Sequence, residues 1–211
     1  VIIIDSGVSN IRSIKRALDY LEVSYKLDTT GKEISRAGHL ILPGVGSFEA
    51  GMNGLKKNNL SEEICEFVKK GNPLLGICLG MQLLFEKSEE FGTHEGLKLI
   101  EGTVKEIPST ENGYLLRKIP HVGWNCLKQK NNRKALQSSL LDGLSSEDYF
   151  YFVHSFMAVP TEKNHILAAT DYCDLDIVAA VKKGNVTGVQ FHTEKSGSSG
   201  LKILKNFILS S

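Results

Sequence analysis

Cys78 is the residue whose surroundings point most directly to chemistry. It follows Leu74–Ile77, a short apolar run typical of a fully buried strand, and glycines stand two residues before and two residues after it, at Gly76 and Gly80. A strand that turns at once into a helix bends sharply, and side chains on neighbouring positions would collide. Because the paired glycines remove that conflict, the pattern predicts a nucleophile elbow with cysteine in place of serine.

The residues after Cys78 indicate the helix that this turn requires. Apolar side chains recur at helical spacing at Met81, Leu84 and Phe85. The first N–H groups of such a helix point toward the thiol, and their partial positive charge favours the thiolate. The alternative is a small, inert, buried cysteine.

A cysteine nucleophile needs a base, and the base needs a group that orients it. Of the six histidines, His192 stands at the end of a predicted strand, 186–191, at the sheet edge where Cys78 is expected if the two strands are parallel. Glu194 follows two residues later, and extended backbone would place both side chains on one side, so that Glu194 holds the far imidazole nitrogen. The alternative for His192 is a surface or structural role.

A glycine-rich loop, 43–48, follows another predicted strand. Ligands bind beyond this end of the strands in open parallel sheets, and nearby glycines leave backbone N–H groups accessible to an anion. No Gly-Lys-Ser/Thr follows, so this is not a P-loop. The alternative is a plain tight turn.

The first part of the chain predicts a parallel sheet with crossover helices. The expected order is strand, helix, strand, weak helix and strand, over residues 1–4, 11–22, 25–28, 31–37 and 39–42. The third strand is expected to stop at Pro43. Residues 49–71 are expected to be helical with a break at Asn58-Asn59, and they lead to the strand before Cys78.

After a polar, turn-rich stretch at 88–96, the pattern changes to short strands with few helices between them. The strand candidates are 97–107, 115–127, 149–153, 166–169, 177–181 and 186–191, with loop at 128–139 and a closing helix at 200–209. The prediction is an α/β fold in one domain, 1–211, with a mostly parallel central sheet, helices on both faces and an added antiparallel portion.

Composition narrows the class of protein. The chain has 211 residues, 41% of them hydrophobic and 23% charged, with a net charge of +1 that suggests neither a nucleic-acid surface nor an anionic membrane surface. The four scattered cysteines favour a reducing compartment, and no metal cluster or cofactor motif is present. No apolar run is long enough to span a bilayer, and no charged leader precedes residues 1–4. A cytoplasmic protein is expected.

Five motifs run in order along nearly the whole chain. They are Asp5-Ser-Gly-x-x-Asn10-x-x-Ser13, Pro43-Gly-Val-Gly46, Pro120-His-Val-Gly-Trp-Asn125, Tyr151-Phe-Val-His-Ser-Phe156 and Gly188-Val-Gln-Phe-His-x-Glu-Lys-Ser196. With Gly76-Ile-Cys-Leu-Gly80 they resemble the triad-type (class I) glutamine amidotransferases, and more narrowly the glutaminase subunits of imidazole glycerol phosphate synthases. The resemblance implies the three-layer fold of that class.

The resemblance also implies a reaction. The Cys78 thiolate attacks the side-chain amide of glutamine, His192 protonates the departing ammonia and then activates water, and Glu194 orients His192. Backbone N–H groups of Leu79 and of the Val45-Gly46 loop hold the oxyanion. Gly46, Gln82, Ser155 and Phe156 bind glutamine. The Gly44–Gly46 loop is expected to be mobile.

In the family the ammonia passes to a partner (β/α)8-barrel cyclase, which uses it to make imidazole glycerol phosphate and AICAR in histidine biosynthesis. The resemblance therefore implies a heterodimer, with no cofactor and no metal in this chain. Asn10, Trp124 and Lys195 match family positions at the subunit interface and the ammonia gate.

Three positions depart from the family pattern, and other functions stay open. Ser6 and Ser9 replace the usual Tyr and second Gly on a partner-facing loop, and Thr193 replaces the usual Pro between His and Glu. The two serines suggest as an alternative a paralogue that feeds ammonia to a sugar-nucleotide amidating synthase for surface polysaccharide. Two further alternatives are a cysteine hydrolase or chaperone with the same elbow, and a non-catalytic binding subunit.

Overall fold

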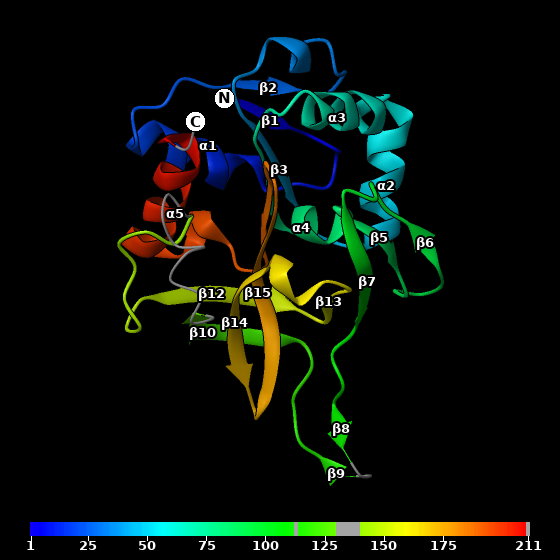
Figure 1. Cartoon of the computed structure of the whole chain (residues 1–211), viewed down its shortest axis with the longest axis vertical. Coiled ribbons are helices and arrows are strands. Elements are labelled where there is room, and N and C mark those ends of the chain that lie inside the picture. Colours follow the sequence, from blue (N-terminus) through cyan, green and yellow to red (C-terminus); the bar gives the residue numbers. More distant parts are fainter. Residues whose placement is uncertain (112–113, 130–139, 210–211) are drawn as a thin grey trace.

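One eight-stranded sheet forms the centre of the molecule (Figure 1). The computed structural model describes residues 1–111, 114–129 and 140–209. In sheet order the strands are β11 (Lys128–Gln129), β14 (Ile166–Tyr172), β15 (Leu175–Lys183), β16 (Val186–Val189), β4 (Leu74–Cys78), β3 (Leu40–Gly44), β1 (Ile2–Ile4) and β2 (Lys26–Asp28). The strands from β16 to β2 are parallel, and β15, β14 and β11 add to them in antiparallel pairs.

Successive side chains of the parallel strands enter two different cores. Ile2 and Ile4 belong to one buried cluster, with Leu40 and Leu42, whereas Ile3 belongs to the other. This is the period-two alternation of a strand whose two faces are both covered.

Helices cover each face of the central sheet. In Figure 1, α1 (Ile11–Tyr20) and α5 (Gly197–Leu209) lie on one side and α2 (Phe48–Lys57) and α3 (Leu60–Lys69) on the other. The first core holds side chains of α2, α3 and the short α4 (Leu79–Leu83), and the second holds those of α1 and α5. Within the described ranges, no helix is long and apolar enough to cross a bilayer.

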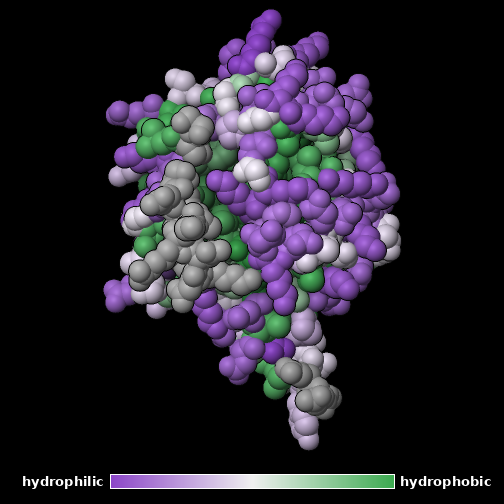
Figure 2. Space-filling view, viewed as in Figure 1, coloured by the Kyte–Doolittle hydropathy of each residue, from purple (hydrophilic) through white to green (hydrophobic). Residues whose placement is uncertain are grey.

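Further strands lie beside this three-layer unit. A four-stranded sheet has the order β13 (Phe156–Pro160), β7 (Ile100–Glu106), β5 (Phe85–Ser88) and β6 (His94–Glu95). A separate antiparallel pair consists of β10 (His121–Cys126) and β12 (Tyr149–His154). The short strands β8 (Thr110–Glu111) and β9 (Tyr114–Leu115) form a narrow arm that projects from a largely hydrophilic face (Figures 1 and 2). Single 3₁₀ turns are η1 (Ile34–Arg36), η2 (Lys163–His165) and η3 (Thr193–Lys195).

The fold confirms the predicted class: a mostly parallel sheet, helices on both faces and an added antiparallel portion. The predicted break between two helices is also confirmed, because Asn58 and Asn59 separate α2 from α3. Asn59 adopts a left-handed backbone with φ 56°, which asparagine tolerates better than most residues.

Three local predictions are wrong. Pro43 does not stop β3, which continues to Gly44 in register with β4; pairing with β1 ends at Ile41, so the missing N–H costs no bond on that side. Residues 31–37 form only η1. The helix after Cys78 ends at Leu83, and Phe85 begins β5 despite its helical spacing.

Some strand limits also differ from the sequence pattern. β13 was not expected, and it arises because the chain turns back at Ser155 to pair with β7. Lys128 and Gln129, expected in a loop, form β11 at the sheet edge. The rest of that predicted loop, 130–139, lies outside the described residues.

Replacing Gly80 should test the junction of β4 and α4. A Cβ at Gly80 would overlap the backbone carbonyl oxygen of Leu42, so we expect Gly80→Ala to lower the free energy of unfolding by about 3 kcal/mol or more. Urea unfolding would measure the change. Gly38→Ala is the control, because nothing lies within 4 Å of the added Cβ there. An unfolding free energy for Gly80→Ala equal to that of wild type would contradict this packing.

Candidate active site

The backbone at Cys78 has the strained conformation of a nucleophile elbow. Cys78 is the last residue of β4, with φ 55° and ψ −113°, and α4 starts at the next residue. A Cβ at Gly76 would lie 2.6 Å from the Gly80 carbonyl oxygen, so the chain can turn this tightly only because both residues are glycine. All four cysteines are free, and Cys78 is buried.

His192 lies at the end of the strand next to β4. The two strands, β16 and β4, are parallel, so their carboxyl ends share one sheet edge as predicted. The His192 N–H donates to the Tyr151 carbonyl at 2.9 Å, and its own carbonyl accepts from Ser196 Oγ at 2.6 Å. These bonds fix the backbone from which the imidazole projects.

Glu194 holds the imidazole, although not through extended backbone. Its Oε1 is 2.7 Å from His192 Nδ1, and the two side chains are only 2% and 3% exposed. The prediction of an extended His-x-Glu segment is wrong, because β16 ends at Val189 and the pair is joined by the turn η3. The turn brings the carboxylate to His192 Nδ1, so the expected contact forms through a turn and not along an extended strand.

The electrostatics of this pair favour a protonated imidazole. Burial lowers the pKa of His192, but interaction with Cys78 and with the Glu194 carboxylate outweighs burial and raises it to about 10. His192 Nε2 is buried and has no hydrogen-bond partner among the described residues. A proton on this nitrogen is therefore held next to the thiol and is available to a group that enters the site.

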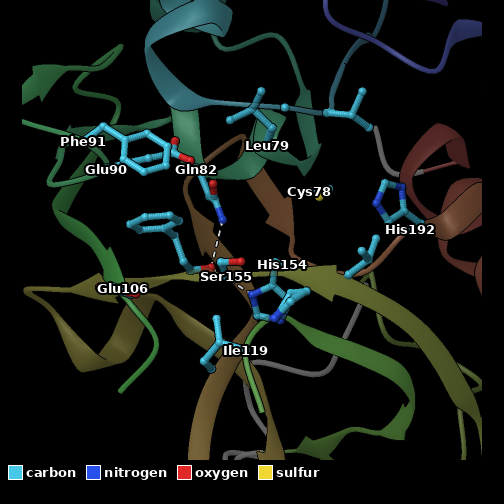
Figure 3. Close-up of a pocket in the computed structure, with 15 residues that line it drawn as sticks. Cys78, Leu79, Gln82, Glu90, Phe91, Glu106, Ile119, His154, Ser155 and His192 are labelled. Atoms are coloured by element: carbon cyan, nitrogen blue, oxygen red, sulfur yellow. Dashed lines mark hydrogen bonds between the residues drawn. The ribbon is translucent and has the colours of Figure 1, made fainter. Parts of the chain in front are cut away.

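Cys78 and His192 open onto a cavity of about 500 Å³. Figure 3 shows Leu79 on one side of the thiol and His154 on the other, with His192 facing Glu90 and Phe91 across the space. Eight of the predicted residues line this cavity: Val45, Gly46, Cys78, Leu79, Gln82, Ser155, Phe156 and His192. The structure thus brings together segments that are far apart in the sequence.

The amide of Gln82 is held in a single orientation. Its Nε2 donates to the Phe156 carbonyl at 3.0 Å, the dashed line in Figure 3, and to Gln190 Oε1 at 2.9 Å. Because both N–H groups are used, Oε1 is the atom that Gln82 can offer to the cavity.

The backbone N–H groups predicted to hold the oxyanion differ in whether they are already hydrogen-bonded. Leu79 is the first residue of α4, where an N–H has no partner within the helix. Gly46 lines the cavity with φ 90°. The Val45 N–H instead donates to the Val8 carbonyl at 2.7 Å, so in this conformation it is not available to an oxyanion.

The three predicted interface residues lie outside the cavity. Trp124 is 52% exposed, and its ring centroid is 5.7 Å from that of Tyr151. Lys195 Nζ lies 5.7 Å from the centroid of the same Tyr151 ring. Asn10 immediately precedes α1. The Tyr151 ring therefore lies near both Trp124 and Lys195, and its centroid is also 6.3 Å from that of His192.

Three further residues belong to the site although the sequence pattern assigns them no role. Glu90 lines the cavity and its Oε2 accepts from the Phe48 N–H at 2.5 Å, at the start of α2. Gln190 Nε2 is 3.8 Å from Cys78 Sγ. His154 also lines the cavity. Gln190 lies inside the predicted strand 186–191, whereas His154 directly follows the predicted strand 149–153. Period-two alternation along these segments was the available signal.

His154 is neutral and part of a buried chain of contacts. Burial lowers its pKa to about 4. Its Nδ1 lies 2.8 Å from the Phe156 carbonyl, so this nitrogen carries the proton, and its Nε2 lies 2.9 Å from His121 Nδ1. His154 thus supports the same carbonyl that orients Gln82.

Comparison with known proteins identifies the family. The sequence matches the family described as "Glutamine amidotransferase class-I" over residues 2–211. The chain belongs to the class-I glutamine amidotransferases. Solved structures share the fold. A "glutamine amidotransferase" crystal structure has a TM-score of 0.73 at 18% identity, covering 99% of this chain and 97% of that one. The structure of "PurLQS from Thermotoga maritima" has a TM-score of 0.72 at 18% identity, covering 98% and 96%.

Other relatives are more similar in sequence, and their names specify a particular synthase. "Imidazole glycerol phosphate synthase subunit HisH 1" of Legionella pneumophila (strain Lens) is 46% identical over 208 residues, which cover 99% of this chain and 98% of that protein. "Imidazole glycerol phosphate synthase subunit HisH" of Caldanaerobacter subterraneus subsp. tengcongensis is 47% identical over 205 residues, covering 97% and 95%. The likeness therefore extends over essentially the full length of both proteins.

The low pKa of His154 predicts a specific acid sensitivity. The unfolded chain takes up a proton near pH 6.5 that the folded chain excludes until about pH 4, so stability is lost as the pH falls through this interval. We expect His154→Gln to reduce this loss, measured by urea unfolding from pH 7.5 to about 4. His94→Gln is the control for removing a less buried histidine. Equal pH dependence in wild type and His154→Gln would contradict a buried neutral His154.

Proposed function

We propose that this chain is the glutaminase subunit of an imidazole glycerol phosphate synthase, with Cys78, His192 and Glu194 as its catalytic triad. The observation that carries the proposal is the buried 2.7 Å contact between His192 and Glu194, beside an elbow cysteine that opens onto the same cavity. The full-length similarity to HisH proteins supports the choice of synthase.

The geometry suits hydrolysis of a carboxamide. The Cys78 thiolate attacks the amide carbon of glutamine, forming a C–S bond, and the C–N electron pair leaves with the nitrogen as His192 delivers its proton there. The products of this half-reaction are ammonia and a γ-glutamyl thioester. His192 then removes a proton from water, which attacks the thioester and releases glutamate and the Cys78 thiolate.

The cavity offers complementary groups for the amino-acid end of glutamine. Glu90 provides a carboxylate for an α-ammonium group, and Gln82 Oε1 provides a further acceptor. Ser155 and Phe156, at the turn between β12 and β13, line the same cavity and would supply backbone groups. A volume of about 500 Å³ is ample for one glutamine molecule.

The oxyanion loop is the part of the site that must change for catalysis. Ser9 Oγ donates to the Pro43 carbonyl at 3.0 Å, and the Val45 N–H donates to the Val8 carbonyl at 2.7 Å. Residues 8–9 therefore hold the loop with the Val45 N–H turned to a partner other than substrate. Release of Val45 when the cyclase binds would complete the oxyanion hole and make ammonia production depend on the complex.

The outer face of β10 and β12 is the surface proposed for the barrel cyclase. Four large apolar side chains of these strands are exposed: Val122, Trp124, Tyr149 and Val153. Their neighbours His121, Phe150, Phe152 and His154 point inward and are buried. An exposed apolar and aromatic face on an otherwise hydrophilic molecule is typical of a protein interface.

The departures from the family pattern leave the triad in place. Thr193 is buried between His192 and Glu194, whose contact forms without the usual proline. Ser6 is buried and Ser9 bonds to Pro43, so both serines act at the N-terminal loop rather than at the thiol. The similar proteins bear the histidine-pathway name, and the sugar-nucleotide alternative is not favoured.

Glutamate release should depend on both Cys78 and the cyclase. We expect the chain with the barrel cyclase and the cyclase's nucleotide substrate to release glutamate at least about 100-fold faster than the chain alone, since one oxyanion donor is worth this much. Cys78→Ala should abolish release, whereas Cys173→Ala, an exposed free cysteine, should not change it.

Two results separate the components of this proposal. If the cyclase does not accelerate glutamate release, but a glutamine-analogue affinity label still alkylates Cys78, the triad is retained and the histidine-pathway cyclase is rejected as partner. Absence of labelling would reject the glutaminase function itself.

Trp124→Ala should weaken the complex with the cyclase. Exposed aromatic side chains at the centre of an interface often contribute about 2 kcal/mol or more, so we expect Kd to rise on the order of 30-fold. Titration calorimetry would measure Kd. Tyr20→Ser removes a still more exposed aromatic ring from α1, outside the proposed surface, and should leave Kd unchanged. Equal affinities for Trp124→Ala and wild type would place the interface elsewhere.

A further inference from the structure

Gln190 is a fully buried polar residue next to the nucleophile. It is 0% exposed, follows the last residue of β16 and precedes His192 by two positions. Its backbone N–H donates to the Ala179 carbonyl at 2.9 Å, which fixes the start of its side chain. A buried amide is costly unless its polar atoms are bonded, so the partners of this side chain show what it does.

Both ends of the Gln190 amide meet residues of the cavity. Its Oε1 accepts from Gln82 Nε2 at 2.9 Å, and its Nε2 donates to Cys78 Sγ at 3.8 Å. The amide therefore joins the nucleophile to a residue that lines the proposed glutamine site.

The Phe156 carbonyl determines which atoms donate and which accept in the series of contacts from Phe156 through Gln82 and Gln190 to Cys78. The Phe156 carbonyl can only accept, so the amide nitrogen of Gln82 must face it, at 3.0 Å. The second N–H of that nitrogen then faces Gln190, which must present its oxygen. The NH₂ group of Gln190 is consequently the end that faces sulfur, and no exchange of oxygen and nitrogen at either amide satisfies all three contacts.

A donor at this place favours the anionic form of the sulfur. An N–H directed at sulfur stabilises the thiolate more than the neutral thiol, because a hydrogen bond to a charged acceptor is the stronger one. The Gln190 N–H lies within bonding distance of Sγ, and the thiol also interacts with the His192 imidazole, although His192 Nε2 has no geometric hydrogen-bond partner among the described residues. A donor from Gln190 can therefore stabilise the thiolate while the His192 proton moves to the leaving nitrogen.

We propose that Gln190 is a positioning residue that stabilises the Cys78 thiolate through its N–H and sets the orientation of Gln82 through its carbonyl. The second role rests on the proposed glutaminase function, whereas the first concerns the thiol alone. One side chain thus prepares the nucleophile and one wall of the substrate site together.

Two variants separate these roles. Gln190→Glu keeps an oxygen acceptor for Gln82 but replaces the donor to sulfur with a carboxylate oxygen. Gln190→Met has similar length and lacks both the donor and the oxygen acceptor. Thr187→Val is the matched control, since it removes a buried polar group from β16, the strand that ends just before Gln190.

The primary readout is the pH dependence of Cys78 alkylation by iodoacetamide, a reagent that does not require glutamine binding. Peptide mass spectrometry of the intact chain follows Cys78, and Cys65, Cys126 and Cys173 serve as internal references. Loss of one charge-assisted hydrogen bond should raise the midpoint for Cys78 by about one pH unit in Gln190→Met and by more in Gln190→Glu. Thr187→Val should alkylate as wild type does.

The second readout is the KM for glutamine in the complex with the cyclase. We expect KM to rise several-fold in Gln190→Met, which leaves the Gln82 amide unfixed, and to stay near the wild-type value in Gln190→Glu. Midpoints equal to wild type in both variants, with unchanged thermal unfolding, would overturn the proposal and leave Gln190 as a core residue. A shifted midpoint in a chain without glutaminase activity would reject the proposed function while supporting the effect on the thiolate.

Discussion

The close crossing of α4 over the ends of β3 and β4 is the constraint on which the rest of the site depends. Gly80 approaches the Leu42 carbonyl, and Gly76 approaches the Gly80 carbonyl, at distances that no side chain permits. This crossing forces Cys78 into a left-handed backbone conformation and directs its thiol out of the sheet. The strain is tolerated because β3, β4 and α4 are buried along their whole length and hold the backbone of the turn.

The parallel order of the strands then brings the remaining groups to the thiol. β3, β4 and β16 are neighbours in the sheet, so the glycine loop, Cys78 and the His192 turn leave it at the same edge. Burial opposes charge on His192, and only the Glu194 carboxylate and the thiol make the imidazolium favourable there. The positive charge on His192 is therefore stable only when Glu194 and Cys78 are in place beside it.

The pair of strands β10 and β12 connects the cavity with the outer surface. Val153 is exposed and His154 is buried, and both line the cavity, so β12 reaches from the outer surface to the cavity wall. His154, which contacts the Phe156 carbonyl, belongs to the same strand, β12, as exposed residues of the proposed cyclase surface. The N-terminal loop provides a second short connection, because Val8 and Ser9 contact the oxyanion loop directly. In the proposed complex, partner binding would therefore act on the catalytic groups over a short distance.

Local chemistry in the sequence was enough to predict the elbow at Cys78, the His192 and Glu194 partners and the α/β class, because glycine spacing and apolar periodicity report directly on backbone geometry. The same patterns misplaced the end of the helix after Cys78, since tertiary packing decides whether Phe85 continues a helix or starts β5. They also gave no role to Gln190, Glu90 or His154, which contact Cys78, Phe48 and His121 respectively, residues distant in sequence. Contacts such as Gln190 to Cys78, 112 positions apart, exist only once the sheet is assembled. The sequence by itself determined which groups could react; the tertiary structure decided which of them meet, because hydrogen bonds act over a few ångströms of space and not along the chain.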